Sequence, residues 1–469
     1  MSNRGASAPV RVDDTLWEIP ADAREDMRVP ARVFADEDLL EAILTDRSLE
    51  QLQNVATLPG IVEAAIAMPD IHQGYGFPVG GLAATAAPDG VVSPGGVGYD
   101  INCGVRLLAA PFTAGELDDR RRGALVAAIA RRVPTGAGKG GPLALGRADL
   151  DAVLEQGPRW LVEHRDVGTA EDVAATESEG RLDGADPAHV SSRARERGSD
   201  QLGTVGSGNH FIELQRVEEV LDRDAAERFG LRRGQVTVLI HSGSRGLGHQ
   251  VCTDYVRRMD AALPRHGITL PDRQLSCAPL DSDEGRAYLG AMAAAANFAW
   301  ANRHAIAHGV RRAIADVVGA DAAAGTRQVY DVAHNVAKLE EHGGRLVCVH
   351  RKGATRAFPG QAVFIPGSMG TASYVLAGRE GSMERSFGTV CHGAGRRLSR
   401  TAAKKQVDGG ALRRELEAQG IAVRAASSRG LAEEAPLAYK DVDSVVRVVE
   451  RAGLAGRVAR LRPIGVVKG

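Results

Sequence analysis

The segment VTVLIHSGSRGLGH, residues 236–249, combines the two features on which the fold prediction rests. Its first five residues are β-branched or aliphatic, which is typical of a buried strand. The rest is rich in glycine and opens at His241 and Ser242. Rigid scaffolds present functional residues on the loops that follow their regular elements. The segment therefore predicts a strand that carries a histidine to a glycine-rich functional loop.

Similar strand patterns recur elsewhere, but they do not alternate regularly with helices. Three further runs predict strands, at 328–332, 345–350 and 362–365. Helical patterns cover 113–134, which a T-x-x-E capping box at Thr113 opens, as well as 149–164, 213–229, 284–318 and 441–452. This irregular order favours an α+β fold over a doubly wound sheet. We expect one domain over residues 1–469, with the polar residues 166–200 as a surface insertion.

The composition is typical of a soluble globular protein. Hydrophobic residues make up 44% of the 469 residues, and 58 Lys and Arg oppose 59 Asp and Glu for a net charge of −1. A disordered chain would have fewer apolar residues and a larger net charge. A protein that coats nucleic acid or membranes through uniform positive charge would be basic. The composition therefore excludes both classes.

The compartment is inferred from cysteine usage and from apolar stretches. The five cysteines follow no disulfide-framework spacing, and the N-terminal residues lack the apolar core of a signal peptide. Arginines and histidines interrupt the most apolar stretch, 287–318, too often for a membrane span. We therefore expect a cytoplasmic protein with free thiols and no membrane partner. A monomer is the default expectation.

Glycine is enriched, and it is concentrated beside side chains that bind metals or phosphates. The 56 glycines are roughly 12% of the chain, against a typical ~7%. Successive backbone N–H groups in glycine-rich loops form anion-binding nests. Segments that contain His, Asp, Cys or Ser, nearly all of them with glycine, are 68–81, 94–104, 203–213, 241–249, 331–335, 366–370 and 391–396. Together they predict phosphate and metal chemistry.

Five side chains in these segments form a candidate metal site. Asp100 and Cys103 lie three residues apart in a glycine-bounded loop, so a carboxylate and a thiolate can converge on one ion. His210, His241 and His334 are near predicted strand ends or glycine loops. The set exceeds what one tetrahedral zinc needs, and a thiolate that bridges two ions would explain the excess. The donor types permit zinc or manganese and favour zinc.

His392, in CHGAGR (391–396), is either another metal ligand or a nucleophile, because histidine can form covalent intermediates. The adjacent glycines and Arg396 and Arg397 resemble a phosphate cradle. The chain contains no P-loop, no G-x-S-x-G motif and no K-x-D-G motif of lysine-dependent nucleotidyl transfer. If the protein carries a nucleotide covalently, a lysine of that type does not carry it.

Taken together, the segments resemble the RtcB family of RNA-splicing ligases. The matching blocks, in the family's order from residue 68 to 469, are MPDIHQGYGFPVGG, GGVGYDINCGVR, GSGNHFIE, HSGSRGLG, YDVAHN, HRKGATRAFPG, IPGSMG, CHGAGRRLSRTAAKK, YKDVD and GVVKG. The resemblance implies mixed sheets flanked by helices around a deep active-site cleft. It also implies a GTP- and Mn²⁺-dependent ligase that joins an RNA 3′-phosphate or 2′,3′-cyclic phosphate end to a 5′-hydroxyl end, in tRNA splicing or RNA repair.

The resemblance also implies roles for individual residues. His392 matches the histidine that becomes guanylylated, and Arg245 matches a basic residue suited to the RNA phosphate. Of two manganese ions, Cys103 would bridge both. Asp100 and His210 would complete one site, and His241 and His334 the other. The guanylate pocket matches Asn209, His210, Phe211, Ile212, Glu213, His334, Asn335, Pro366, Gly367, Ser368, Met369, Ser373, His392, Gly393, Ala394, Gly395 and Lys468.

Two other functions stay open at this point. A metal-dependent phosphoesterase or nuclease could use the same donors without GTP, and a non-catalytic RNA-binding protein could retain the site for structure. Because the net charge is −1, RNA binding requires local positive charge, which we expect at Arg245, at Arg351 and Lys352, and along 395–405. The sequence does not reveal the physiological RNA or any need for an archease-type activator.

Overall fold

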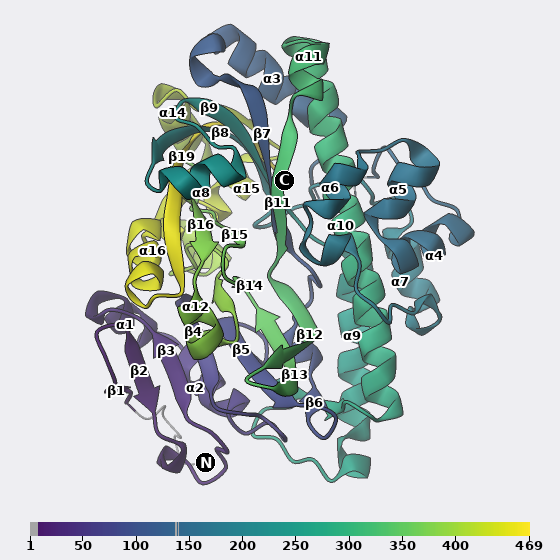
Figure 1. Cartoon of the computed structure of the whole chain (residues 1–469), viewed down its shortest axis with the longest axis vertical. Helices are drawn as coiled ribbons and strands as arrows, with labels where there is room; N and C mark the ends of the chain where they lie inside the picture. The colour runs from purple at the N-terminus through teal and green to yellow at the C-terminus, as the bar shows by residue number, and fades with distance from the viewer. Residues whose placement is uncertain (1–7, 137, 139) are drawn as a thin grey trace.

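The computed structural model describes residues 8–136, 138 and 140–469, and it confirms the predicted α+β class (Figure 1). Two large sheets dominate, one in the upper and one in the lower half of the view. In the described parts of the chain we find no helix with the length and apolarity needed to cross a lipid bilayer.

The eight-stranded sheet has the order β11-β7-β9-β8-β19-β16-β15, with β18 paired to β19. Neighbouring strands run antiparallel, except that β18 and β19 are parallel. It contains three of the predicted strands, which are confirmed: the strand that begins the 236–249 segment, the one at 328–332 and the one at 362–365. Its strands are β7 (Gly104–Thr113), β8 (Phe211–Val220), β9 (Gln235–Ser242), β11 (Arg327–Ala333), β15 (Ala362–Ile365), β16 (Ser373–Gly378), β18 (Ala422–Ala425) and β19 (Ala455–Lys468).

The seven-stranded sheet has the order β1-β2-β3-β4-β5-β13-β12 and is mixed, because β3 and β4 run parallel. Its strands are β1 (Val10–Arg11), β2 (Leu16–Ile19), β3 (Ala31–Phe34), β4 (Ala65–His72), β5 (Val79–Ala86), β12 (Asn335–His342) and β13 (Arg345–Lys352). Two further pairs join β6 (Val91–Val92) to β10 (Ala278–Pro279) and β14 (Ala354–Arg356) to β17 (Thr389–Cys391).

Strand β9 shows why this sequence forms a central strand. Val236, Val238 and Ile240 pack into one apolar cluster with α3 (Asp119–Arg132) and α10 (Asp283–Val317), whereas Leu239 packs on the other face of the sheet. Side chains along a strand alternate between the two faces. His241 therefore shares the face of Leu239, and its ring lies 5.4 Å from the ring of Phe211 on the neighbouring strand.

Helices cover both sheets, and several predicted helices are confirmed. The 35-residue α10 matches the prediction for 284–318, and α16 (Val442–Arg451) matches 441–452. Residues 149–164 form two helices that meet at Gly157, α4 (Arg147–Gln156) and α5 (Pro158–Arg165). The remaining helices are α1 (Glu37–Ile43), α2 (Ser48–Val55), α6 (Ala170–Ala174), α7 (Ser192–Gly198), α8 (Arg223–Phe229), α9 (Arg245–Ala262), α11 (Ala320–Ala324), α12 (Glu380–Ser386), α13 (Arg400–Gln406), α14 (Gly409–Ala418) and α15 (Ser428–Glu433).

Two helix predictions are wrong in part. Only the end of 213–229 is helical, as α8, because residues 211–220 pair with β9 and β19 as strand β8. Sheet pairing there outweighs local helical propensity. The capping box of Thr113 and Glu116 forms, but it stands at the start of a short 3₁₀ helix (Ala114–Glu116). The α3 helix that follows has Asp118 as its own N-cap.

Residues 166–200 are more than a polar surface segment. Asp172 and Glu177 are buried, and the Glu177 carboxylate accepts a hydrogen bond of 2.9 Å from the backbone N–H of Ala333. Asp172 forms a two-pronged ion pair with Arg311 on α10. Acidic residues are tolerated in the interior only when they are paired. Two acidic side chains of this segment are therefore packed against the main body of the protein, whereas many of its other charged residues are exposed.

Candidate active site

Four adjacent strands of the eight-stranded sheet bring predicted metal donors to one edge. Cys103 precedes β7, His210 precedes β8, His241 lies at the end of β9, and His334 follows β11. In an antiparallel sheet the start of one strand lies beside the end of its neighbour. The strand order β11-β7-β9-β8 therefore places the four side chains side by side.

The five predicted donors form one connected set. The Cys103 Sγ lies 3.3 Å from His210 Nε2 and 3.2 Å from His241 Nε2. His241 Nε2 lies 3.3 Å from His334 Nε2, and His210 Nε2 lies 2.8 Å from Asp100 Oδ2. Donors this close can share ions whose bonds are about 2.0–2.3 Å long. Cys103 occupies the middle of the set, between His210 and His241.

The protonation of these buried groups fits a cation. Burial lowers the pKa of His210, His241 and His334, so the rings are neutral, as a metal ligand must be. Burial, and then the charge of Asp100, raise the pKa of the Cys103 thiol well above its usual range. A metal ion deprotonates a coordinating thiol, which offsets that shift. The donor set is therefore chemically suited to metal binding.

His392 lies beside this set and is oriented by a buried carboxylate. Its ring centroid is 4.9 Å from that of His334. The His392 Nδ1 donates a 2.6 Å hydrogen bond to Asp70 Oδ2, and its backbone N–H donates to the same oxygen at 3.1 Å. Asp70 lies on β4 and is fully buried. A carboxylate accepts hydrogen bonds, so this contact favours a proton on Nδ1 and does not involve Nε2 of His392.

A cavity of about 820 Å³ opens onto both His392 and the metal donors. This volume is within the range of small-molecule sites. The predicted residues along its wall are Asp100, Cys103, Asn209, Phe211, His241, His334, Asn335, Pro366, Gly367, His392, Gly393, Ala394 and Gly395. The structure therefore brings most of the predicted site residues around one cavity.

Three further predicted residues are buried just behind the wall and are connected to it. Gln215 donates to Glu213 Oε2 at 2.7 Å and to Ser373 Oγ at 3.1 Å, and Ser373 Oγ accepts from the Gly367 N–H at 3.3 Å. Lys468, at the end of β19, donates to the His210 carbonyl at 2.8 Å. Burial raises the pKa of Glu213 to about 8 and lowers that of Lys468 to about 8.

Other predicted residues point away from the cavity. The Ile212 side chain packs with α3 and α10 on the opposite face of the sheet, and Met369 packs against α14. Ser368 is buried, and its backbone N–H donates to Thr371 Oγ1 at 2.8 Å. The Arg245 guanidinium, by contrast, lies beside the donor set, 3.0 Å from His210 Nδ1.

The prediction that Arg351 offers positive charge to RNA is wrong, whereas Lys352 does lie in the cavity wall. Arg351 is fully buried and forms a two-pronged ion pair with Glu340, at 2.7 and 2.8 Å. The Lys352 ammonium is buried and donates to backbone carbonyls, including that of Phe77 at 3.1 Å. Arg351 therefore stabilises the interior, and the Lys352 ammonium is held by backbone carbonyls at the cavity wall. Arg397 and Arg400, in the predicted basic stretch 395–405, are exposed at the cavity mouth.

The sequence interpretation missed Asp70 and Tyr439 as site residues. Both belong to segments that it had singled out, MPDIHQGYGFPVGG and YKDVD. Asp70 orients His392, whereas Tyr439 lines the cavity with the Arg396 guanidinium 5.0 Å from its ring centroid. A carboxylate beside a histidine in a glycine-rich block was the available signal for Asp70. The sequence separation of Asp70 or Tyr439 from His392 gives no sign that either residue lies near it in the fold.

A family model described as tRNA-splicing ligase RtcB matches residues 51–469. The chain belongs to the RtcB family. It is 54% identical to the tRNA-splicing ligase RtcB of Thermococcus kodakarensis over 98% of both chains. It is 50% identical to that of Archaeoglobus fulgidus, again over 98% of both, and 51% identical to the RNA-splicing ligase RtcB of Mycobacterium tuberculosis over 89% of this chain and 100% of the relative. The resemblance seen in the motifs is thus confirmed along nearly the whole chain.

Proposed function

We propose that this RtcB-family protein is a GTP- and Mn²⁺-dependent RNA ligase. It joins RNA 3′-phosphate or 2′,3′-cyclic phosphate ends to 5′-hydroxyl ends through a covalent His392–GMP intermediate. The observation that carries the proposal is the placement of His392 in one cavity with the metal donors, with Nδ1 bound to Asp70 and Nε2 free. A lone metal-binding hydrolase site would not require a histidine oriented in this way.

The donor set suits two ions that share Cys103. We assign Asp100 and His210 to one ion, and His241 and His334 to the other, with the Cys103 thiolate between them. Such ions, when bound, neutralise phosphate charge and orient the reacting groups. Cys103 lies within 3.3 Å of a histidine from each pair, which supports the sharing. Manganese rather than zinc follows from the family resemblance.

His392 is the proposed nucleophile. Its Nε2 attacks the α-phosphorus of GTP, so that an N–P bond forms and the P–O bond to pyrophosphate breaks. The imidazolium that results keeps its Nδ1–H on Asp70, whose carboxylate stabilises the new positive charge. Asp70 therefore acts in this step as a positioning and charge-stabilising group.

The next steps transfer the guanylate to RNA and seal the strand. An oxygen of the RNA 3′-phosphate attacks the same phosphorus, which breaks the N–P bond and gives an RNA 3′-pp-5′-G end. The 5′-hydroxyl oxygen of the second RNA then attacks the RNA 3′-phosphorus and GMP leaves. A cyclic phosphate end is first opened to a 3′-phosphate by water.

Glu213 is proposed to select guanine. An ionised carboxylate accepts hydrogen bonds from the N1–H and 2-amino group of guanine, whereas adenine has no donors in those positions. The raised pKa of Glu213, about 8, means that ionisation is disfavoured until such donors arrive. The remaining predicted pocket residues, from Asn209 to Glu213, Asn335, Pro366 to Met369, Ser373, Gly393 to Gly395 and Lys468, would enclose the guanylate. Residues whose side chains pack elsewhere, such as Ile212, would contribute backbone only.

The proposed RNA substrates are tRNA halves or broken RNAs with these ends. Arg245 and the exposed Arg397 and Arg400 would contact RNA phosphates. We propose that the enzyme works as a cytoplasmic monomer. Ligation assays with and without an added archease-type protein test whether an activator is needed.

Labelling with [α-³²P]GTP and Mn²⁺, followed by denaturing electrophoresis, tests the proposal. The wild type should retain the label and His392→Ala should lose it. His189→Ala, which alters an exposed histidine away from the cavity wall, should label normally. A fully labelled His392→Ala protein would refute the assignment. Opening of cyclic phosphate ends without GTP and without any ligation would favour the phosphoesterase alternative.

A further inference from the structure

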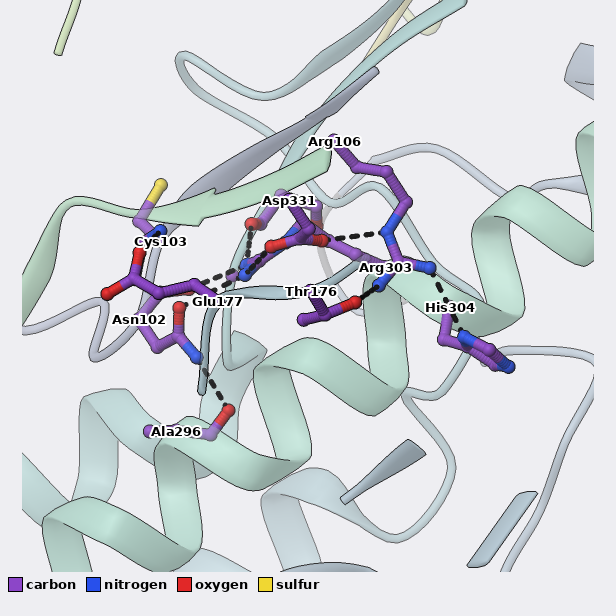
Figure 2. A network of polar contacts seen from close by, with 12 residues as sticks. Asn102, Cys103, Arg106, Thr176, Glu177, Ala296, Arg303, His304 and Asp331 are labelled. Carbon is purple, nitrogen blue, oxygen red and sulfur yellow. Dashed lines mark hydrogen bonds and ion pairs between the residues drawn. The ribbon is translucent and has the colours of Figure 1, made fainter. Parts of the chain in front are cut away.

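A buried ion-pair cluster of Arg106, Arg303 and Asp331 lies near Cys103 (Figure 2). All three side chains are fully buried. Arg106 Nε donates to Asp331 Oδ2 at 2.7 Å, and Arg303 Nη2 donates to Asp331 Oδ1 at 2.8 Å. Two cations thus share one carboxylate in the interior, an arrangement that needs further partners to be stable.

Arg303, on α10, finds those partners on the two loops that carry metal donors. Its Nη1 donates to the Asn102 carbonyl at 2.7 Å and to the Ser242 carbonyl at 2.9 Å. Asn102 immediately precedes Cys103, and Ser242 immediately follows His241. Arg303 Nη1 therefore links the backbone next to Cys103 to the backbone next to His241.

The remaining guanidinium donors are also used. Nε donates to both Asp331 oxygens, and Nη2 donates to Asn102 Oδ1 at 3.0 Å. The amide of Asn102 in turn donates to the Ala296 carbonyl on α10 at 2.7 Å (Figure 2). Asp331 lies on β11, three residues before His334. The guanidinium thus contacts elements that carry Cys103, His241 and His334.

The backbone around Cys103 is shaped to admit this guanidinium. Asn102 has a positive φ of 51°, a conformation that asparagine tolerates better than most residues. A Cβ on Gly104 would lie 2.8 Å from Arg303 Cζ and 2.2 Å from the Val332 carbonyl oxygen. The sequence on both sides of Cys103 therefore accommodates Arg303.

Arg106 provides an internal contrast. It is equally buried and binds the same carboxylate, but its other donors face His304 Nδ1 at 3.2 Å and Thr176 Oγ1 at 3.4 Å. No described hydrogen bond of the Arg106 side chain reaches the residues beside Cys103 or His241. Both arginines therefore place a buried positive charge on Asp331. Only the Arg303 side chain also binds the backbone beside Cys103 and His241.

We infer that Arg303 is a positioning residue for the proposed metal site, which fixes the separation of Cys103 and His241 by clamping the carbonyls beside them. The inference rests on the proposed metal donors. Partners outside the ligand shell that orient ligands typically change metal affinity 10- to 100-fold when removed. Lysine cannot replace arginine here, because one ammonium cannot reach two carbonyls, an amide oxygen and a carboxylate in one plane.

Cobalt(II) titration of the metal-free protein tests this inference, because a cobalt–thiolate charge-transfer band reports Cys103 directly. The wild type should show the band, and its absence would overturn the metal site itself and this inference with it. Arg303→Lys should raise the Co²⁺ Kd by about 10- to 100-fold and shift or weaken the band. Arg106→Lys should keep the Kd within about 2-fold, even where thermal unfolding shows both variants equally destabilised.

Equal Co²⁺ binding by the two variants, whether both normal or both weakened, would overturn the role of Arg303 while leaving the metal site in place. Asn102→Gly covers the case in which Arg303→Lys does not fold. Glycine keeps the positive φ and the carbonyl but removes Asn102 Oδ1, so the Co²⁺ Kd should still rise, by about 3- to 10-fold. A wild-type Kd in Asn102→Gly would contradict the inference.

Discussion

The two halves of the proposed active site are built in different ways. In the donor half, Cys103, His210, His241 and His334 come from adjacent strands of one sheet, and Arg303 donates hydrogen bonds to the backbone beside Cys103 and His241. In the His392 half, Asp70 comes from the seven-stranded sheet and His392 follows β17, a strand of a small separate pair. Hydrogen bonds from the Nδ1 and the backbone N–H of His392 to Asp70 Oδ2, together with close backbone packing, join these two segments.

The packing in the His392 half depends on a glycine and a lysine. Gly395 has a φ of 74°, and a Cβ there would lie 2.2 Å from the Asp70 carbonyl oxygen. Lys440 donates to the Pro69 carbonyl at 3.0 Å and to the Ile71 carbonyl at 2.6 Å, on either side of Asp70. Strand register therefore fixes the donor half, whereas contacts between distant segments fix the His392 half. Single substitutions should therefore impair one half of the site and leave the other half intact.

Cys103→Ala should have the largest effect, because it removes the donor common to both pairs. We expect ligation to fall at least about 10³-fold, since metal stabilisation of phosphate charge is worth several kcal/mol. Metal analysis and ligation rates at several Mn²⁺ concentrations provide the measurement. Cys277→Ala, which alters a buried thiol outside the cavity, is the matched control. Retained Mn²⁺ dependence in Cys103→Ala would contradict the bridging role.

Asp70→Asn should impair the guanylylation of His392 and leave metal binding by the donor half unchanged. Loss of the acceptor frees the His392 ring to adopt the wrong tautomer, so guanylylation should slow by about 10²- to 10⁴-fold. Single-turnover labelling with [α-³²P]GTP measures this rate. Co²⁺ affinity should stay within about 2-fold of wild type. A parallel loss of metal affinity would show that the two halves are not separable.

Glu213→Gln should affect nucleotide choice and pH dependence more than metal binding. Ionised Glu213 is the form that accepts guanine's donors, and its pKa in the folded protein is about 8. GTP binding at pH 7 should therefore release a proton, and the wild-type KM for GTP should fall as pH rises from 6.5 to about 8. The variant should lose this dependence and much of its preference for GTP over ATP. A pH-independent wild-type KM would argue against the proposed contact.

The same substitution should raise stability without nucleotide. Because folding raises this pKa above its usual 4.5, ionisation of Glu213 opposes folding increasingly as pH rises from 4.5 to about 8. Glutamine removes that cost, so the Tm difference between variant and wild type should grow over this pH range. The test is to measure the Tm of the variant and of the wild type by thermal unfolding at pH 5 and at pH 8. An equal Tm difference at both values would contradict the buried, protonated state.

Arg397→Ala should have the smallest effect. Arg397 is exposed at the cavity mouth, and the two halves do not depend on it. RNA affinity should weaken modestly, and the slope of log K against log salt should decrease by about 1. Guanylylation without RNA should be unchanged. The buried Arg351 is a poor site for the same test, because its loss would leave Glu340 unpaired.

The sequence predicted the donor half better than the His392 half. Cys103 and the three histidines were predicted as neighbours because ligand types stand at the ends of recognisable strands or beside glycine loops, and the structure brings them together. Asp70 was missed because its pairing with His392 spans 322 residues and follows no local period. The error at 213–229 has a similar cause, since pairing with β9 and β19 decides that β8 is a strand. The Arg351 error arose because charge alone does not reveal a buried partner.

The sequence by itself determined the α+β class, the family and the chemical types available at the site, because these depend on local pattern and on motif order. Only the tertiary structure decided which charges face the cavity, which carboxylate binds His392 and which arginine hydrogen-bonds to the backbone beside Cys103 and His241. Those properties depend on contacts between segments far apart in the chain. A hydrogen bond or a buried ion pair acts over about 3 Å, and only the folded backbone brings such partners within that distance.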